Sequence, residues 1–445
     1  VAVLDGGIAA WEAAGYRIYS GVHVPSKAFA EVVEHEAGTP WISAPELQKL
    51  IDSGADIAIF DSRSYEEYHN NSIPTAISVP GAELVYRFTD LTPSPDTTVI
   101  VNCGGRTRSI IGAQSLINAG FANKIMSLKD GTMAWHLAGL DVVQGATARP
   151  PEVSAAGLAE ARESAARVAA RCNIPRIDRP TLERWRAAAA ERSLYVLDVR
   201  TPEEYEAGHL RGARSAPGGQ LVQETDAHVA TWGGRIALVD DNGVRATMTA
   251  SWLKQMGWSD VAVLTAGPAD GDWVSGPYVP RVLGLDAAAP AEIGAAELSR
   301  ELETGKAAVV DLDYSRRYAQ GHIPGAWFAT RARLAAALGR LPAAGAIVLT
   351  SPDSRLAQLA AADLAGVASV PVKILAGGTQ AWENAGLPLE RGPTHMADEA
   401  DDVVLSARER NQDREAAMRE YLEWEINLVN DMATDDDHRF QVAVG

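Results

Sequence analysis

Short apolar runs alternate with amphipathic stretches along the chain, most clearly between residues 38 and 148. From Ile110 to Ile117, apolar residues recur at helical spacing. Ser43 and Glu46 form a capping-box sequence, which predicts the start of another helix. Strands that alternate with helices predict an α/β fold with a mainly parallel sheet covered on both faces. The runs that predict buried strands are 57–60, 76–79, 98–102 and 124–128.

The same order of landmarks occurs three times, which predicts three repeats of this unit. The landmarks are an acidic residue that ends an apolar run, a small-residue loop after a later run, an Arg five residues into that loop, and a Trp. The acid-to-loop spacings are 42, 42 and 39 residues, and the loop-to-Trp spacings are 32, 33 and 32. The landmarks are Asp61, Cys103, Arg108 and Trp135; Asp198, Asp240, Arg245 and Trp273; and Asp311, Thr350, Arg355 and Trp382.

These spacings place complete repeats at 38–148, 176–283 and 290–392. A further Gly-x-x-Ala-Trp sequence ends at Trp11, so residues 1–34 are expected to be the C-terminal remnant and linker of a truncated repeat. Without most of their own core, they are expected to be poorly ordered or wrapped on the 38–148 repeat.

Two segments lie outside the repeats. Residues 149–175 are rich in Ala, Glu and Arg and predict one exposed helical linker. Residues 393–445 form an acidic tail, in which apolar residues from Met418 to Met432 fall at helical spacing. This pattern favours a helix docked on its own protein over a helix that binds a partner.

Composition narrows the function classes. The net charge is −18, from 40 Lys and Arg against 58 Asp and Glu, which argues against a nucleic-acid or anionic-membrane binder. No apolar run has the roughly 18 residues of a spanning helix. The two cysteines, Cys103 and Cys172, cannot form a disulfide framework, and a reducing, cytoplasmic compartment is expected. The chain begins with Val rather than Met, so its true start, with any signal peptide, is expected to be missing.

The segment Cys103-Gly104-Gly105-Arg106-Thr107-Arg108-Ser109 lies between a predicted strand and a predicted helix. Backbone N–H groups of a glycine-rich turn, the helix N-terminus and two guanidinium groups all favour an anion there. They also favour the thiolate of Cys103, which predicts a nucleophilic cysteine acting on a small anionic substrate.

This loop, the Asp61-Ser62-Arg63 sequence and the Gly-x-x-Ala-Trp sequence together resemble the rhodanese, or sulfurtransferase, family, across residues 1–392. The resemblance implies tandem rhodanese-like α/β domains. It also implies ping-pong transfer of a sulfane sulfur through a Cys103 persulfide, with no metal or organic cofactor. The expected partners are a small anionic sulfur donor and a thiophilic acceptor, with an acceptor protein left open. The implied cradle for the donor is Gly104, Gly105, Arg106, Thr107 and Arg108.

Two other functions remain open on the sequence. Phosphatases of the same fold use a Cys-x5-Arg loop to fit the larger phosphate, whereas Cys103 to Arg108 is Cys-x4-Arg, which favours sulfur. A persulfide carrier or sensor that docks a partner protein, with little small-molecule turnover, is the second alternative. The repeats that carry Asp240 and Thr350 in place of the cysteine are expected to be non-catalytic, and Asp240 is expected to repel an anion.

The supporting residues are predicted less specifically. The Arg106 and Arg108 pair favours thiosulfate over 3-mercaptopyruvate as the donor, and Arg108 has either a structural or a catalytic role, or both. Some family members carry a donor-binding Arg where this chain has Glu67, and Arg87 is a candidate substitute. Asp61, with Arg63 beside it, is interpreted mainly as a hydrogen-bond acceptor at a strand end. Cys172 is interpreted as a small helix residue rather than a resolving thiol.

Overall fold

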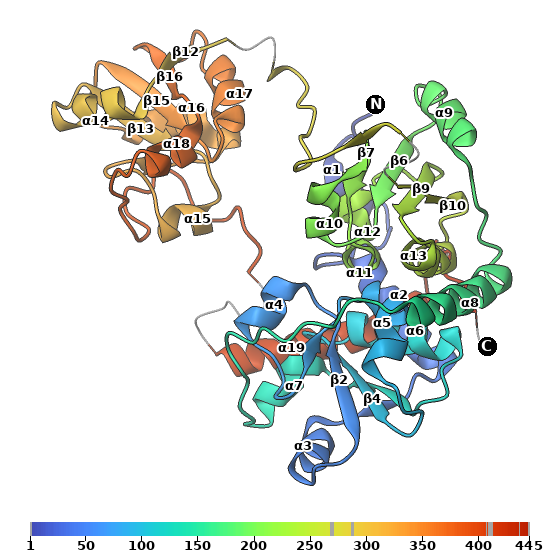
Figure 1. The fold of residues 1–445 in the computed structure, drawn as a ribbon. Helices are drawn as coiled ribbons and strands as arrows, with labels where there is room; N and C mark the ends of the chain where they lie inside the picture. The colour runs from blue at the N-terminus through green and yellow to red at the C-terminus, as the bar shows by residue number, and fades with distance from the viewer. Residues whose placement is uncertain are drawn as a thin grey trace. The chain divides into compact units, whose positions relative to one another are not determined.

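The structure is a computed structural model that describes residues 2–267, 271–285, 289–405, 407, 413–435 and 437–443. The chain forms two compact units, one of residues 1–278 with 411–445 and one of residues 279–410 (Figure 1). The second unit is therefore an insertion in the sequence of the first. The predicted tail at 393–445 is divided between them, because Met396 pairs with Phe328 inside the second unit.

The first repeat is built on a five-stranded parallel sheet in the order β1-β5-β4-β2-β3. All four predicted strands are present, and the capping box of Ser43 and Glu46 begins a helix as expected. The strands are β1 (Trp41–Ile42), β2 (Ile57–Asp61), β3 (Ile77–Ser78), β4 (Thr98–Asn102) and β5 (Ile125–Leu128). The helices are α3 (Ala44–Asp52), α4 (Tyr65–Asn70), α5 (Glu83–Leu91), α6 (Thr107–Ala119) and α7 (Gly131–Leu137).

The second repeat has a four-stranded parallel sheet in the order β10-β9-β6-β8, and β7 and β11 form a separate antiparallel pair. Its strands are β6 (Leu194–Asp198), β7 (His209–Leu210), β8 (Arg214–Ser215), β9 (Arg235–Asp240), β10 (Val261–Thr265) and β11 (Trp273–Val274). Its helices are α9 (Arg179–Ala187), α10 (Pro202–Ala207), α11 (Gly218–Gln223), α12 (Thr225–His228) and α13 (Val244–Gln255).

The third repeat forms the second unit and repeats the strand order of the first, as β12-β16-β15-β13-β14, all parallel. The predicted fold class, tandem α/β domains with parallel sheets, is thus confirmed. The strands are β12 (Ala291–Ile293), β13 (Ala307–Asp311), β14 (Trp327–Phe328), β15 (Ala346–Thr350) and β16 (Val372–Leu375). The α-helices are α14 (Ala295–Glu303), α15 (Ser315–Gln320), α16 (Leu334–Ala337), α17 (Arg355–Asp363) and α18 (Gly378–Asn384).

The aromatic landmarks make recurring contacts, except at Trp273, which lies in β11. The indole Nε1 of Trp135 donates to the carbonyl six residues later, and Trp11 and Trp382 do the same. The hydroxyl of Tyr68 donates to the carbonyl eight residues later, and Tyr205 and Tyr318 do the same. These rings therefore close equivalent turns, and all of them except the exposed Trp11 are buried.

The linker helix α8 (Ala155–Arg171) is not exposed as expected. It packs against α5 and α6 of the first repeat and against α13 of the second (Figure 1). Ala161, Ala165 and Val168 are each 1% exposed. Their small side chains allow the helices to approach closely. This face of α8 is therefore buried, although its sequence is only weakly hydrophobic.

The segments before and after the repeats also pack on the first unit. The exposed helix α1 (Gly7–Ala13) is followed by α2 (Val24–Ala37), whose central residues are buried against α6, α11 and α12. Near the end of the chain, α19 (Arg414–Met432) packs on α2. The prediction of a tail helix docked on its own protein is confirmed. None of the described helices is long and apolar enough to cross a membrane.

Candidate functional site

Cys103 lies directly after β4, where the chain turns into α6. Its side chain is buried, with 2% exposed, and its thiol donates to the Ser109 hydroxyl over 3.4 Å. That hydroxyl in turn donates to the Arg106 carbonyl. The thiol therefore lies at the N-terminal end of a 13-residue helix, where the helix dipole favours negative charge.

The N-terminus of α7 fixes the orientation of the loop that begins at Cys103. The N–H groups of Thr132 and Met133 donate to the carbonyls of Cys103 and Gly104, over 2.9 and 3.2 Å. Gly131 makes this approach feasible, because it has φ +53° and a Cβ there would lie 2.4 Å from the Cys103 carbonyl oxygen. Since peptide planes are rigid, carbonyls held toward α7 direct the N–H groups of the same peptides the other way.

The second repeat shows what such a loop binds. Asp240 occupies the position of the cysteine, and its carboxylate accepts from the N–H groups of Gly243 and Ala246, over 2.7 and 3.0 Å. These donors correspond in sequence to Arg106 and Ser109 of the first repeat. The Asp240 carboxyl group therefore occupies its own cradle. Burial raises its pKa, although the two N–H groups and Arg245 oppose the rise. The two contacts identify this loop geometry as an anion site.

The third repeat offers no thiol either. The sequence spacing assigns Thr350 to the cysteine position, but the structure places Ser351 there. Asp311 pairs with Thr350 as Asp61 pairs with Asn102, and the Thr379 N–H donates to the Ser351 carbonyl as Thr132 donates to that of Cys103. The Ser351 hydroxyl accepts from the Ala357 N–H over 3.3 Å. Asp311, the counterpart of Asp61, has Asp313 where the other repeats have an Arg, and burial raises its pKa to about 7. Among the described residues, the first repeat alone joins a cysteine to the cradle.

Arg108 ties the loop to α4. Its guanidinium forms a two-point pair with Glu67, over 2.6 and 2.8 Å. Burial opposes ionisation of Glu67, but Arg108 outweighs it and lowers the pKa of Glu67 to about 2. Arg245 pairs with Glu204 in the same way in the second repeat, at the same separation of 41 residues. Glu67 stands where some family members carry a donor-binding arginine. In this chain it is the partner of Arg108.

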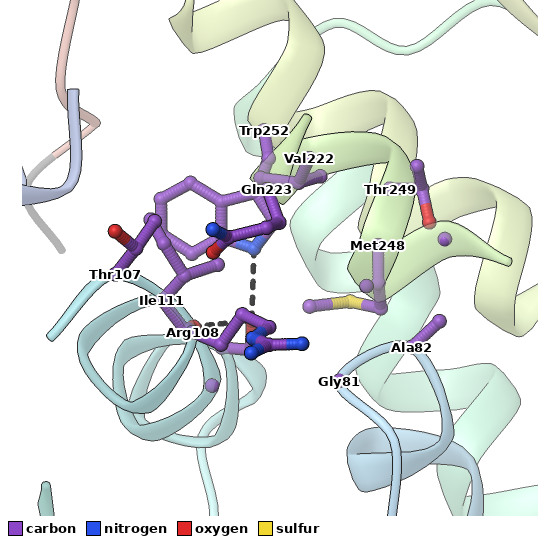
Figure 2. A pocket seen from close by; sticks show the side chains of 14 residues that line it. Gly81, Ala82, Thr107, Arg108, Ile111, Val222, Gln223, Met248, Thr249 and Trp252 are labelled. Atoms are coloured by element: carbon purple, nitrogen blue, oxygen red, sulfur yellow. Dashed lines mark hydrogen bonds between the residues drawn. The ribbon is translucent and has the colours of Figure 1, made fainter. Parts of the chain in front are cut away.

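Arg108 also lies at the contact between the first two repeats, where it donates to Gln220 over 2.8 Å. Figure 2 shows Arg108 and Ile111 of α6 opposite Met248 and Trp252 of α13. A cavity of about 30 Å³ remains between them, which has room for a single water. The second repeat therefore closes this side of the loop.

Arg106 does not lie as the sequence interpretation requires. Its guanidinium is buried and bonds to three carboxylates, those of Glu31 and Glu34 of α2 and of Asp130. Because three carboxyl groups already accept from this guanidinium, its positive charge is compensated within the protein. Burial raises the pKa of Glu31 to about 7, although Arg106 opposes this. The expected role of Arg106 in donor binding is corrected: its guanidinium anchors α2 to the loop.

Asp61 and Arg63 form an ion pair with each other. They form a fully buried pair with contacts of 2.6 and 2.8 Å, and Asn102 donates to the same carboxylate. Asp198 and Arg200 repeat the pair in the second repeat. The interpretation of Asp61 as a strand-end acceptor agrees with these contacts.

Arg87 lies away from the described contacts of the cysteine loop. It bonds to Glu83 over 2.6 Å and to the carbonyl of Pro151. It lines a cleft of about 510 Å³ between the first two repeats, which Arg149 and Gln220 also line. Nothing in these contacts links Arg87 to a donor bound at Cys103.

Sequence reasoning missed the residues of α19 that cover the loop. The Thr107 hydroxyl donates to Glu425 over 2.8 Å, and Tyr421 and Leu422 lie within 4 Å of the position of a Cβ on Gly105. A signal was present, because Glu425 is an acidic residue on the otherwise apolar face that predicted the helix.

Cys172 caps the C-terminal end of α8, where it is half-buried. Burial raises the pKa of its thiol, which disfavours the thiolate that a resolving cysteine needs. Its packing supports the interpretation as a small helix residue.

The chain is similar to known proteins over nearly all of its length. A family model described as rhodanese-like domain matches residues 43–138, 181–269 and 294–385. A crystal structure of thiosulfate sulfurtransferase from Pseudomonas aeruginosa is 45% identical, with a TM-score of 0.92. The alignment covers 98% of this chain and 83% of that chain.

Two curated relatives match a single repeat each. An HTH-type transcriptional regulator, Rv0324, of Mycobacterium tuberculosis is 33% identical over 105 residues, 24% of this chain and 45% of the regulator. A putative sulfur carrier protein, YrkF, of Bacillus subtilis is 28% identical over 102 residues, 23% of this chain and 54% of the carrier. The chain thus spans about half the length of these two relatives.

Proposed function

The chain belongs to the rhodanese family, and we propose that it is a thiosulfate sulfurtransferase that works through one cysteine, Cys103. The observation that carries the proposal is the position of Cys103 at the start of its loop. In the equivalent loop of the second repeat, backbone N–H groups donate to the carboxyl group of Asp240. The similarity to the thiosulfate sulfurtransferase of Pseudomonas aeruginosa supports the same donor.

In the first half of the reaction, the Cys103 thiolate attacks the outer sulfur of thiosulfate. The sulfur–sulfur bond breaks, and sulfite leaves with the bonding electrons. The loop N–H groups and the N-terminus of α6 stabilise the anionic donor and the developing sulfite. Arg108, held by its two-point pair with the Glu67 carboxylate, fixes the position of the loop.

In the second half, an acceptor such as cyanide or a thiol attacks the outer sulfur of the Cys103 persulfide and restores the thiolate. Both steps exchange sulfur–sulfur bonds, so we propose that no metal or organic cofactor takes part. Dialysis against a chelator is expected to leave turnover unchanged. An acceptor protein and a cytoplasmic location stay predictions.

The alternatives receive less support. A phosphatase needs a larger loop than the four residues between Cys103 and Arg108 provide. A carrier or sensor with little turnover is distinguished by rate, because it would pass sulfur quickly to a partner thiol and slowly from small donors to cyanide.

The test is the intact mass of the protein after thiosulfate treatment, with and without a cyanide chase. The expected result is a gain of one sulfur atom that the chase removes. Cys103→Ser is expected to abolish the gain and turnover, while Cys172→Ser, the matched control, retains both. Turnover that persists in Cys103→Ser would sink the assignment.

A further inference from the structure

Glu425 of α19 is a buried acid at the catalytic loop that sulfur transfer, as described above, does not use. Its side chain is 1% exposed, and its Oε1 accepts from the Thr107 hydroxyl over 2.8 Å. Its Oε2 makes no hydrogen bond of good geometry among the described residues, although Tyr421 lies beside the carboxyl group, and it is 3.3 Å from the position of a Cβ on Gly105. A buried polar atom without a partner is costly, so this one indicates a ligand held on the loop.

The surroundings of Glu425 hold several charged or titratable groups. Lys27 and Glu31 lie on α2, Arg106 on the loop, and Tyr421 one turn away on α19. The Lys27 ammonium lies 5.1 Å from the centre of the Tyr421 ring. Burial raises the pKa of Glu425, although Thr107, Lys27, Arg106 and Tyr421 oppose the rise. A protonated carboxyl has one O–H group to donate, and a donor anion on the loop would accept it.

We propose that Glu425 is a catalytic proton-transfer residue, which gives a proton to the departing sulfite and recovers one from an acceptor thiol. This proposal rests on the proposed function, because it assigns a role within the same reaction. It adds a group from outside the three repeats to the active site.

The protons and charges balance in the first half of the reaction. The Cys103 thiolate bonds to the outer sulfur of the thiosulfate dianion, and the sulfur–sulfur bond of the donor breaks. Sulfite takes the proton of Glu425 and leaves as hydrogen sulfite. Glu425 remains as a carboxylate beside the persulfide, and its charge disfavours the return of sulfite.

The second half restores the starting state. The acceptor thiol gives its proton to the Glu425 carboxylate as its sulfur bonds to the outer sulfur of the persulfide. The bond between that sulfur and the Cys103 Sγ breaks, and its electrons regenerate the thiolate. Overall, a thiosulfate dianion and a thiol give hydrogen sulfite and a persulfide anion, with one proton given and one recovered.

The test compares Glu425→Gln with Glu423→Gln, an exposed position on the same helix. The glutamine at 425 keeps the size of the side chain and can accept from Thr107, but it carries no transferable proton. We expect kcat with a thiol acceptor to fall about 100-fold, the lower end of general acid–base effects. Glu423→Gln is expected to match the wild type.

The pH profile separates proton transfer from a structural role. In the wild type, kcat/KM for thiosulfate is expected to fall as pH rises through the pKa of Glu425, because the protonated form is required. This limb is expected to vanish in Glu425→Gln and to persist in Glu425→Asp, which retains an acid. Circular dichroism checks that each variant is folded.

The outcomes distinguish the two proposals. A wild-type rate and pH profile in Glu425→Gln, or an equal pH-independent loss in Glu425→Gln and Glu425→Asp, would overturn the role of Glu425 and leave Cys103 as the sulfur carrier. Absence of a persulfide on the wild-type enzyme would overturn the proposed function itself.

Discussion

Gly131 shows how one residue sets the geometry of the cysteine loop. Its positive φ and missing side chain let the first N–H groups of α7 reach the carbonyls of Cys103 and Gly104. Gly378 makes the same approach in the third repeat, where a Cβ would lie 2.1 Å from the Ser351 carbonyl oxygen. The glycine of the Gly-x-x-Ala-Trp sequence is thus needed for the close approach of this helix N-terminus to the loop carbonyls.

We expect Gly131→Ala to reduce sulfur transfer strongly, because the new Cβ would displace the loop. Gly139→Ala is the matched control, since Gly139 also has a positive φ (+73°) but no atom within 4 Å of its Cβ position. Both variants carry backbone strain of about 1 kcal/mol or more. A lower melting temperature in Gly131→Ala than in Gly139→Ala, with activity lost only in the former, is the expected result. Equal effects in both would contradict it.

The pair of Arg108 and Glu67 predicts a pH dependence of stability. Arg108 lowers the pKa of Glu67 to about 2 in the folded protein, from an ordinary value of 4.5. The stabilisation is therefore complete above about pH 4.5 and is lost as pH falls toward 2. In urea titrations, the stability difference between wild type and Glu67→Gln is expected to shrink from pH 6 to pH 3. Glu66→Gln, at an exposed neighbour, is expected to show no such change.

At the scale of elements, the sequence predicted what depends on local pattern. Strand and helix alternation, the capping box at Ser43 and the loop of Cys103 all follow from residues close together in the chain. The partners of Arg106 could not be predicted, since Glu31 lies 75 residues away and on an element assigned to a remnant. The burial of α8 was also missed, because alanines carry little hydrophobic signal while they permit close helix packing.

The burial of α8 leads to a test of its own. Ala165 is 1% exposed and belongs to the core of the first repeat. Ala165→Leu adds three carbons to a packed contact and is expected to destabilise the first unit by about 1–3 kcal/mol. Ala166→Leu, at an exposed position of the same helix, is expected to leave the unfolding midpoint nearly unchanged. Similar midpoints for the two variants would show that α8 is not packed as described.

At the scale of the molecule, Cys103 and the third repeat belong to different compact units, each with its own core. Calorimetry is expected to resolve two transitions, with sulfur transfer lost in only one of them. Leu349→Ala, in the core of the third repeat, is expected to lower the free energy of unfolding of the second unit by about 2–5 kcal/mol. The other transition and the activity are expected to stay unchanged. A single transition that shifts with activity would contradict this division.

The contact between Thr107 and Glu425 joins residues 318 positions apart, with a whole domain between them. A ribosome adds about 5–20 residues per second, so roughly 15–65 seconds pass between the synthesis of the two. The newly made first repeat can fold during that interval without α19 over its loop. The speed of translation therefore sets how long the nascent first repeat stands without α19 over Gly105 and Thr107.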